Sequence, residues 1–251
     1  ILFLAVARSL WRTAYWKLAI LGTLFLVAEI SFFTSNLTKV AHGAWLPLSV
    51  GLLAAVVMLT WRRGRVIVTR NRTEEEGPLE EFLDELRTAD PPILRIPKVA
   101  VYLSPGKLTT PLALRADVEH YGVLPDKVLI VAVVPVSVPH VDRGDQFELE
   151  RIGQGLMKVV HLTIRAGYQD SQNVPAALAL ARKRGFLDRN LDLEHASYFV
   201  SRMTMTPTAG PGMARWRKLL FIGMARNATS PIEHFGLPID STVAVSSHVA
   251  I

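Results

Sequence analysis

Two long apolar runs near the N-terminus constrain this chain more than any other feature. The first run, residues 18–33, contains a single charged residue, Glu29, and the second run, residues 44–61, contains none. Each approaches the roughly 20 residues that cross a hydrocarbon core. Because backbone inside lipid must satisfy its own hydrogen bonds, such runs are best interpreted as helices. The sequence therefore predicts two transmembrane helices joined by a short polar turn.

Basic residues flank this predicted hairpin on its outer sides. The densest cluster follows the second run and includes Arg62, Arg63 and Arg65, whereas the turn between the runs carries one cation, Lys39. Positive residues concentrate on the cytoplasmic side of membrane proteins. We therefore expect both ends of the hairpin on that side, with the three arginines setting the topology. A soluble pair of buried helices is the alternative, and the arginine cluster and flanking tryptophans argue against it.

The net charge of +6 is unevenly distributed along the chain. Residues 1–72 hold nine Lys or Arg and one acid, whereas residues 73–251 hold nineteen Lys or Arg and twenty-one acids. The basic excess therefore surrounds the apolar runs, where it would contact anionic lipid. It offers no basic groove for a nucleic acid, and we expect no nucleic-acid partner. The absence of cysteine excludes disulfides and thiolate chemistry.

Composition divides the chain into three parts. The membrane part covers residues 1–72, and residues 1–7 read as the end of an earlier helix. A signal peptide would need a basic region before its apolar core and a small-residue cleavage site after it, and neither is present. Residues 73–94 form an acidic segment with apolar residues at helical spacing, which predicts an amphipathic connector helix. We expect the chain to be the C-terminal part of a larger membrane protein.

Alternating strand and helix patterns then predict a cytosolic α/β domain over residues 95–251. A strand, a helix and a second strand follow one another from residue 99 to residue 136, as in a βαβ unit. The whole fold class is thus a membrane α-helical hairpin followed by a cytosolic α/β domain. Strands are predicted at 99–103, 128–136, 196–203 and 243–249, a β-hairpin at 147–152 and 156–165, and helices at 110–121, 174–183 and 212–228.

The α/β domain shows no catalytic or metal-binding constellation in its sequence. Its histidines lack metal-ligand spacing such as HExxH. Residues 104–109 (SPGKLT) lack the GxxxxGK[ST] pattern of a phosphate loop, and residues 153–155 (GQG) read as a hairpin turn. Residues 210–212 (GPG) open a helix whose amides could receive an anion, although a structural turn is favoured. We expect no enzyme activity, no cofactor, no metal site and no catalytic residue.

One titratable residue in the apolar runs is a candidate for function. Glu29 lies deep in the first run, and an ionisable group inside a membrane is costly and is by default a functional hypothesis. The alternative is a protonated or hydrogen-bonded glutamate at a helix–helix contact. The sequence identifies no partner for Glu29, so it favours the structural interpretation.

Three stretches together resemble one known family. They read FFTSNLTKVAHGAWLP at 32–47, TWRRGR at 60–65 and TPTAGPGMARWRKLLFIGMARN at 206–227. These stretches are similar to the C-terminal third of the bacterial KUP/HAK/KT potassium uptake permeases, and the similarity is collinear over nearly the whole chain. The resemblance implies twelve spans with both ends cytoplasmic, of which residues 18–33 and 44–61 are the last two.

The resemblance implies potassium uptake by symport with protons across the plasma membrane, with K⁺ and H⁺ as the transported ions. It places the ion-binding and proton-relay residues upstream, so no K⁺-binding residue is assigned in this chain; Glu29 falls where the family commonly carries an acid. The implied partners are membrane lipid, the remainder of the transporter, a second copy in a homodimer, and a cyclic dinucleotide that regulates the cytosolic domain. The alternative is a membrane-tethered nucleotide-sensing or dimerisation module without transport.

Overall fold

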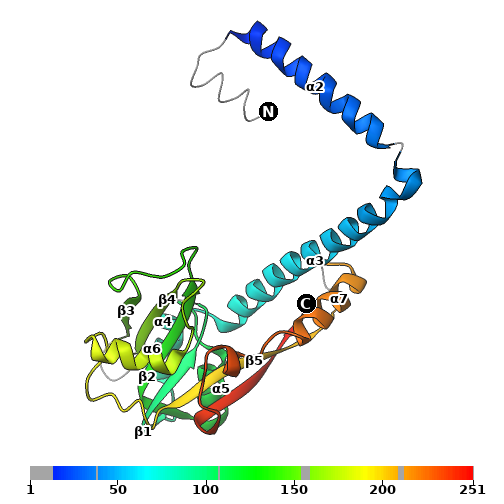
Figure 1. Ribbon diagram of the computed structural model, residues 1–251. Helices are drawn as coiled ribbons and strands as arrows, with labels where there is room; N and C mark the ends of the chain where they lie inside the picture. Colours follow the sequence, from blue (N-terminus) through cyan, green and yellow to red (C-terminus); the bar gives the residue numbers. More distant parts are fainter. Residues whose placement is uncertain (1–13, 38, 107, 154–158, 209–211, 251) are drawn as a thin grey trace. The chain divides into compact units, whose positions relative to one another are not determined.

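The computed structural model describes residues 14–37, 39–106, 108–153, 159–208 and 212–250 (Figure 1). The predicted end of an earlier helix at residues 1–7 lies outside the described residues, as do parts of the GQG and GPG motifs. The chain divides into two compact units, residues 1–59 and 60–251.

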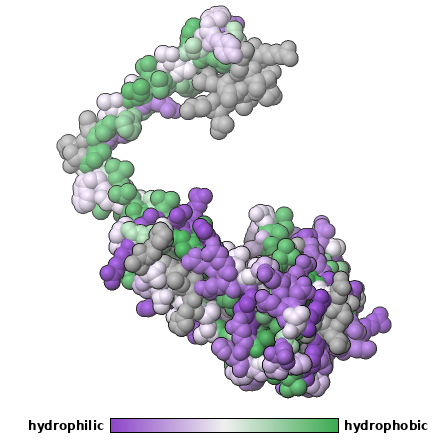
Figure 2. All heavy atoms as spheres, turned by 180° about the vertical axis from the view of Figure 1, so that it is seen from behind, coloured by the Kyte–Doolittle hydropathy of each residue, from purple (hydrophilic) through white to green (hydrophobic). Residues whose placement is uncertain are grey.

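Two long helices carry the apolar runs. Helix α2 spans Tyr15–Leu37 and helix α3 spans Trp45–Glu76, with a π-helical turn at Val40–Ala44 between them. Both are long and apolar enough to cross a membrane. None of the residues of α2 is buried, and Figure 2 shows hydrophobic side chains along these helices. The expected pair of apolar helices is confirmed, and each helix is longer than its apolar run.

Helix α3 continues well beyond its apolar run, which ends at Trp61. Ion pairs between residues one turn apart support this continuation. Arg70 Nε lies 2.8 Å from Glu74 Oε1, and Arg72 Nε lies 2.6 Å from Glu76 Oε1. The predicted connector at 73–94 is therefore not one helix, because its first residues belong to α3.

A sharp break separates α3 from the next helix. Gly77 has a φ of +61°, a left-handed conformation that glycine adopts without strain. Helix α4 then spans Leu79–Thr88. Its apolar side chains at Leu79, Phe82 and Leu86 are all buried. The amphipathic pattern of the connector is thus confirmed for α4, which packs its apolar face onto the sheet.

The α/β domain is built on a six-stranded sheet in the order β3-β4-β2-β1-β5-β6. Five strands are parallel, and β3 pairs antiparallel with β4. Every predicted strand is present, and the two strands of the predicted βαβ unit, β1 and β2, are parallel neighbours. The strands are β1 Leu94–Leu103, β2 Val123–Pro135, β3 Phe147–Ile152, β4 Val159–Ala166, β5 Ser197–Thr206 and β6 Thr242–Ala250.

Helices cover both faces of this sheet (Figure 1). On one face, Leu178 of α6 packs in a core cluster with Val101 of β1. On the other face, α4 and α5 pack in a second cluster that contains Tyr102, the next residue of β1. Successive residues of a strand point to opposite faces, so β1 supplies both cores. The helices are α5 Leu112–Tyr121, α6 Val174–Lys183, α7 Arg215–Arg226 and the short α8 Pro231–His234.

Helix α7 packs beside the second half of α3 (Figure 1). Gly64 of α3 lies directly against Phe221 of α7, because a Cβ atom on Gly64 would overlap the phenyl ring. The ring of Trp61 lies 5.4 Å from the same phenyl ring, centroid to centroid. Thr60 is fully buried, and its Oγ1 accepts a hydrogen bond of 3.1 Å from Arg217 Nε. The continuation of α3 is therefore part of the core of the domain.

Replacing Gly64 with alanine should destabilise the domain by about 1–3 kcal/mol, because the added methyl group overlaps the Phe221 ring. Gly223 offers a matched control inside α7, since nothing lies within 4 Å of a Cβ atom at that position. Gly223→Ala should be neutral or stabilise by up to about 1 kcal/mol through helix propensity. Denaturant unfolding of the detergent-solubilised chain measures both variants. Equal stability of the two would contradict the packing.

Candidate functional site

The sequence-predicted site residues lie on the two long helices. Glu29 is exposed on α2, and no hydrogen bond or ion pair joins it to another described residue. Arg62, Arg63 and Arg65 are exposed on α3, directly after the apolar run. Arg63 Nε donates a hydrogen bond of 3.4 Å to Gly212 O, just before α7. Their positions are compatible with a membrane boundary, and their topological role stays a prediction.

A buried polar cluster that the sequence did not reveal lies at the C-terminal end of α3. Glu76 is 2% exposed. Its Oε1 is paired with Arg72 Nε at 2.6 Å, and its Oε2 accepts a hydrogen bond of 2.5 Å from Thr109 Oγ1. Its carbonyl oxygen accepts a hydrogen bond of 3.0 Å from Arg115 Nη2. Arg72, Glu76, Thr109 and Arg115 together form what we call the α3 clamp.

The α3 clamp joins the end of α3 to the segment that follows β1. A buried carboxylate is costly unless it is paired and hydrogen-bonded, and the clamp supplies both. Backbone contacts close the same junction: Leu79 N donates to Leu108 O at 2.8 Å, and Thr110 N donates to Gly77 O at 3.0 Å. The end of α3 and the loop after β1 are therefore held as one unit.

A cavity lies beside the clamp, at the point where the strand order reverses. Strands β2 and β4 follow β1 on one side, and β5 and β6 lie on the other. In open parallel sheets, ligands bind outside the carboxyl ends of the strands at such a point. The cavity measures about 230 Å³, and its walls come from β1, β2, β5, α8 and Arg72 of α3. This position makes it the candidate ligand site of the domain.

The chemistry of this carboxyl-edge cavity suits an apolar ring that carries an anionic group. Its walls are mainly aliphatic and aromatic, and Ser104, Ser201 and Arg72 supply the polar groups. Ser201 Oγ is buried and makes no hydrogen bond to another described residue. Arg72 belongs to both the cavity and the α3 clamp. An anionic group in the cavity would therefore compete with Glu76 for the same guanidinium.

A larger cavity of about 680 Å³ lies at the opposite, amino edge of the sheet. Two of the cations that line it are already engaged. Arg95 Nε lies 3.2 Å from Asp126 Oδ1, and Lys127 Nζ donates to Asn190 O at 3.4 Å. Because ligands of parallel sheets gather at the carboxyl edge, we do not assign the candidate site to this cavity.

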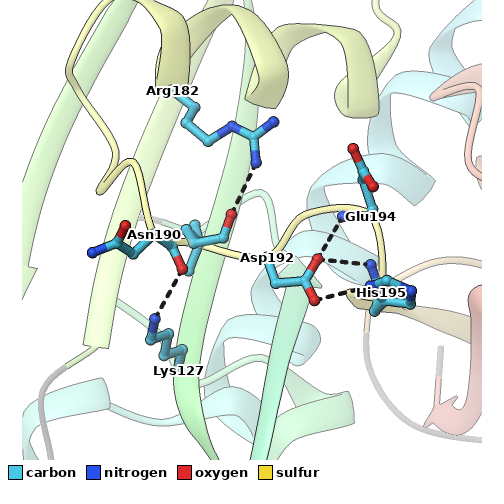
Figure 3. Close-up of polar contacts among 7 residues, drawn as sticks. Lys127, Arg182, Asn190, Asp192, Glu194 and His195 are labelled. Atoms are coloured by element: carbon cyan, nitrogen blue, oxygen red, sulfur yellow. Dashed lines mark hydrogen bonds and ion pairs between the residues drawn. The ribbon is translucent and has the colours of Figure 1, made fainter.

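The loop between α6 and β5, which borders the larger cavity, is held by its own polar contacts (Figure 3). Arg182 Nη1 donates to Leu191 O at 3.0 Å. The carboxylate of Asp192 accepts from the backbone amides of His195 and Glu194 and contacts His195 Nδ1 at 2.9 Å. These bonds, chiefly that from the His195 amide, lower the pKa of Asp192. Because the polar groups of this loop are hydrogen-bonded to one another, we interpret it as a structural turn.

Comparisons with known proteins give similarities over the whole chain. Residues 1–66 match the family description "K+ potassium transporter integral membrane domain", and residues 97–251 match "K+ potassium transporter C-terminal domain". A "Probable potassium transport system protein Kup" from Rhodococcus jostii is 39% identical over 100% of this chain and 38% of its own length. Proteins of the same name from Cutibacterium acnes and Methylococcus capsulatus are 36% and 34% identical over 100% of this chain, which covers 38% and 39% of their lengths. No solved structure matches the chain.

Replacing Glu76 with glutamine should loosen the junction at the end of α3, because it leaves the Arg72 guanidinium, only 13% exposed, without its counter-charge. Breaking a buried pair in this way costs about 3 kcal/mol. Hydrogen exchange at the amides of Leu79 and Thr110 should accelerate by about two orders of magnitude. Glu74→Gln is the control, since its pair with Arg70 is exposed to solvent and contributes little to stability. Similar exchange in the two variants would refute the clamp.

Proposed function

The chain belongs to the potassium transporter family, and on that basis we propose that it is the C-terminal part of a proton-coupled potassium uptake transporter in the plasma membrane. The observation that carries this proposal is that the membrane domain and the C-terminal domain of the family match in order along one chain. The sequence-based resemblance to the KUP/HAK/KT family is thereby confirmed. The proton coupling and the transport itself are proposals for the whole protein.

The chain spans less than two fifths of the length of its curated relatives. We therefore propose that the residues that bind K⁺ lie in the remainder of the transporter and that the two helices of this chain flank the transport path. Glu29 is the acid within the apolar run of α2, and an exposed carboxyl group in lipid is costly without a function or a partner. We propose that Glu29 is protonated or hydrogen-bonded and contacts a polar group of the upstream spans; a part in proton movement is the alternative.

The α/β domain is proposed to lie in the cytoplasm. The exposed arginines at positions 62, 63 and 65 follow the apolar run directly, where cytoplasmic flanks carry their positive charge. The proposed division into a membrane part at 1–72, a connector at 73–94 and a cytosolic domain at 95–251 follows composition, and the packing of α3 on α7 from Thr60 onward adds the end of that helix to the domain. The unburied apolar surface of α2 suits contact with lipid, with upstream spans or with a second copy.

The cytosolic domain is proposed to regulate transport through α3. This helix is continuous from its apolar run to the α3 clamp. Arg72 lines the carboxyl-edge cavity and also pairs with Glu76, so a ligand there would act on the end of the same helix. The cavity is smaller than the roughly 300–1,000 Å³ of drug-sized pockets. We propose that it receives one base of a cyclic dinucleotide, with a phosphate near Arg72.

The same cavity supports a second candidate function. In this alternative, the chain is a membrane-tethered nucleotide-sensing or dimerisation module that transports nothing. The two candidates share the ligand and differ in the activity of the whole protein. Transport by the full-length parent protein distinguishes them.

The full-length parent protein should restore growth at low K⁺ in cells that lack their own uptake systems. Glu29→Gln keeps the hydrogen-bonding capacity of the side chain and should leave K⁺ uptake nearly unchanged, whereas a loss of uptake and of the accompanying H⁺ entry by on the order of 100-fold would instead assign Glu29 a proton-transferring role. Ser31→Ala, on the same helix, is the control and should leave uptake unchanged. Uptake by Glu29→Gln at the rate of the unchanged protein would remove the proton role. Failure of the expressed parent to support growth would favour the tethered module.

Calorimetry of the detergent-solubilised chain with cyclic di-adenosine monophosphate tests the regulatory ligand. We expect heat of binding, and Ser201→Leu should lower the affinity by about tenfold or more, because the larger side chain fills the cavity and lacks the hydroxyl group that would bond the ligand. Ser246→Leu, exposed on the edge strand β6, is the matched control and should bind normally. No heat at saturating ligand would reject the nucleotide proposal and leave the transport proposal standing.

A further inference from the structure

Helix α7 runs alongside α3 in the same direction. Its first turns contact the end of the apolar run, since Arg217 bonds to Thr60 and Phe221 packs on Trp61. Its C-terminal end lies further along α3, where Ala225 and Thr69 line a common cavity. The N-terminal turn of α7 is therefore level with the last residues of the apolar run of α3.

This turn exposes an aromatic and basic surface that nothing in the described structure covers. Trp216 is 57% exposed and Leu219 is 54% exposed, although Phe221 and Ile222 of the same helix are buried. Arg215 is exposed, and α7 contains four cations and no acid. On the neighbouring helix, Arg63 and Arg65 are also exposed. We call this surface the boundary patch; it comprises Arg63, Arg65, Arg215, Trp216 and Leu219.

The composition of the boundary patch and its position along α3 indicate which partner binds it. Tryptophan favours the headgroup level of a bilayer, where its ring is half in hydrocarbon and half in water. Helices that present Trp and Leu beside Arg bind membrane surfaces, and anionic lipid strengthens that binding. The patch sits where the apolar run of α3 ends, so lipid headgroups are the first surface within its reach. The concentration of cations fits phosphate groups better than an apolar protein surface.

We propose that the boundary patch inserts into the headgroup layer of the membrane and binds the phosphates of anionic phospholipid. Trp216 and Leu219 reach the boundary between the headgroups and the acyl chains, and the arginines hold the phosphates. The packing of Gly64 on Phe221 then makes α3 and α7 a rigid pair with two contacts to the same leaflet. This inference rests on α3 spanning a membrane and is independent of which ion the whole protein moves.

The chain contains no cysteine, so a single spin label can report the depth of the patch. The full-length parent, with any cysteine outside this chain replaced by serine, is labelled at Leu219→Cys and placed in nanodiscs of phosphatidylcholine with or without phosphatidylglycerol. We expect the label to collide with oxygen and to be shielded from a water-soluble nickel complex, more so with phosphatidylglycerol. A label at Asn190→Cys, exposed on the far edge of the sheet, should show the opposite accessibility.

Two pairs of charge variants distinguish the effect of the boundary patch from the effect of net charge. Arg63→Gln with Arg215→Gln should lower the ratio of lipid-inserted to water-exposed label by about fivefold per arginine in anionic nanodiscs. Arg70→Gln with Arg226→Gln removes the same charge from the same two helices further from the boundary and should have little effect. The proposal would be overturned if the label at position 219 were exposed to water in every lipid, or if the two pairs of variants had equal effects. It would also be overturned if the label were shielded from both reagents in detergent, because that result indicates a protein contact.

Discussion

A backbone that leaves lipid as a helix must keep its polar groups hydrogen-bonded until water or protein can take them over, and α3 meets this constraint by staying helical from Trp45 to Glu76. Its first part is apolar, and its second part is packed against the sheet domain. Gly64 allows the close approach of Phe221, and Thr60 is buried with a hydrogen bond from Arg217. One helix thus serves two environments, and the rest of the domain is arranged around its second half.

The end of this helix is held by charge rather than by apolar contact. Glu76 is almost completely buried, and its carboxylate is stable there because Arg72 and Thr109 surround it. Arg72 also reaches the cavity at the point where the strand order reverses. A change of charge in that cavity would therefore act on Arg72, which directly contacts Glu76 at the end of a membrane helix. The larger cavity at the amino edge has no such connection to α3 among its lining residues.

Much of this architecture could be predicted from the sequence, and the failures have physical causes. The apolar runs and the buried strands are predictable from the sequence. A helix in lipid and a strand covered on both faces of its sheet each require a continuous run of apolar residues. The continuation of α3 to Glu76 was missed because its residues are mostly charged. The spacing of Arg72 and Glu76 equals that of Arg70 and Glu74, yet one pair is buried and the other exposed. Only the tertiary structure distinguishes them.

The candidate site was beyond sequence reasoning for a related reason. The cavity is lined by Ser104, Ser201 and Phe235, which are far apart in the sequence and belong to no recognised motif. They meet because β1 and β5 are neighbours, and strand order follows from packing rather than from local pattern. By contrast, the helix at α6 was predicted at its observed bounds, since Asn173 caps it locally through a bond to the Ala176 amide.

The pairing of β1 with β5 has a consequence for how the protein is made. Ala100 lies opposite Ser197, so the central strand cannot gain this neighbour until roughly a hundred further residues have left the ribosome. The apolar helices emerge long before that moment. Insertion into the bilayer therefore precedes completion of the sheet, and the growing chain folds the α/β domain after its helices have entered the membrane.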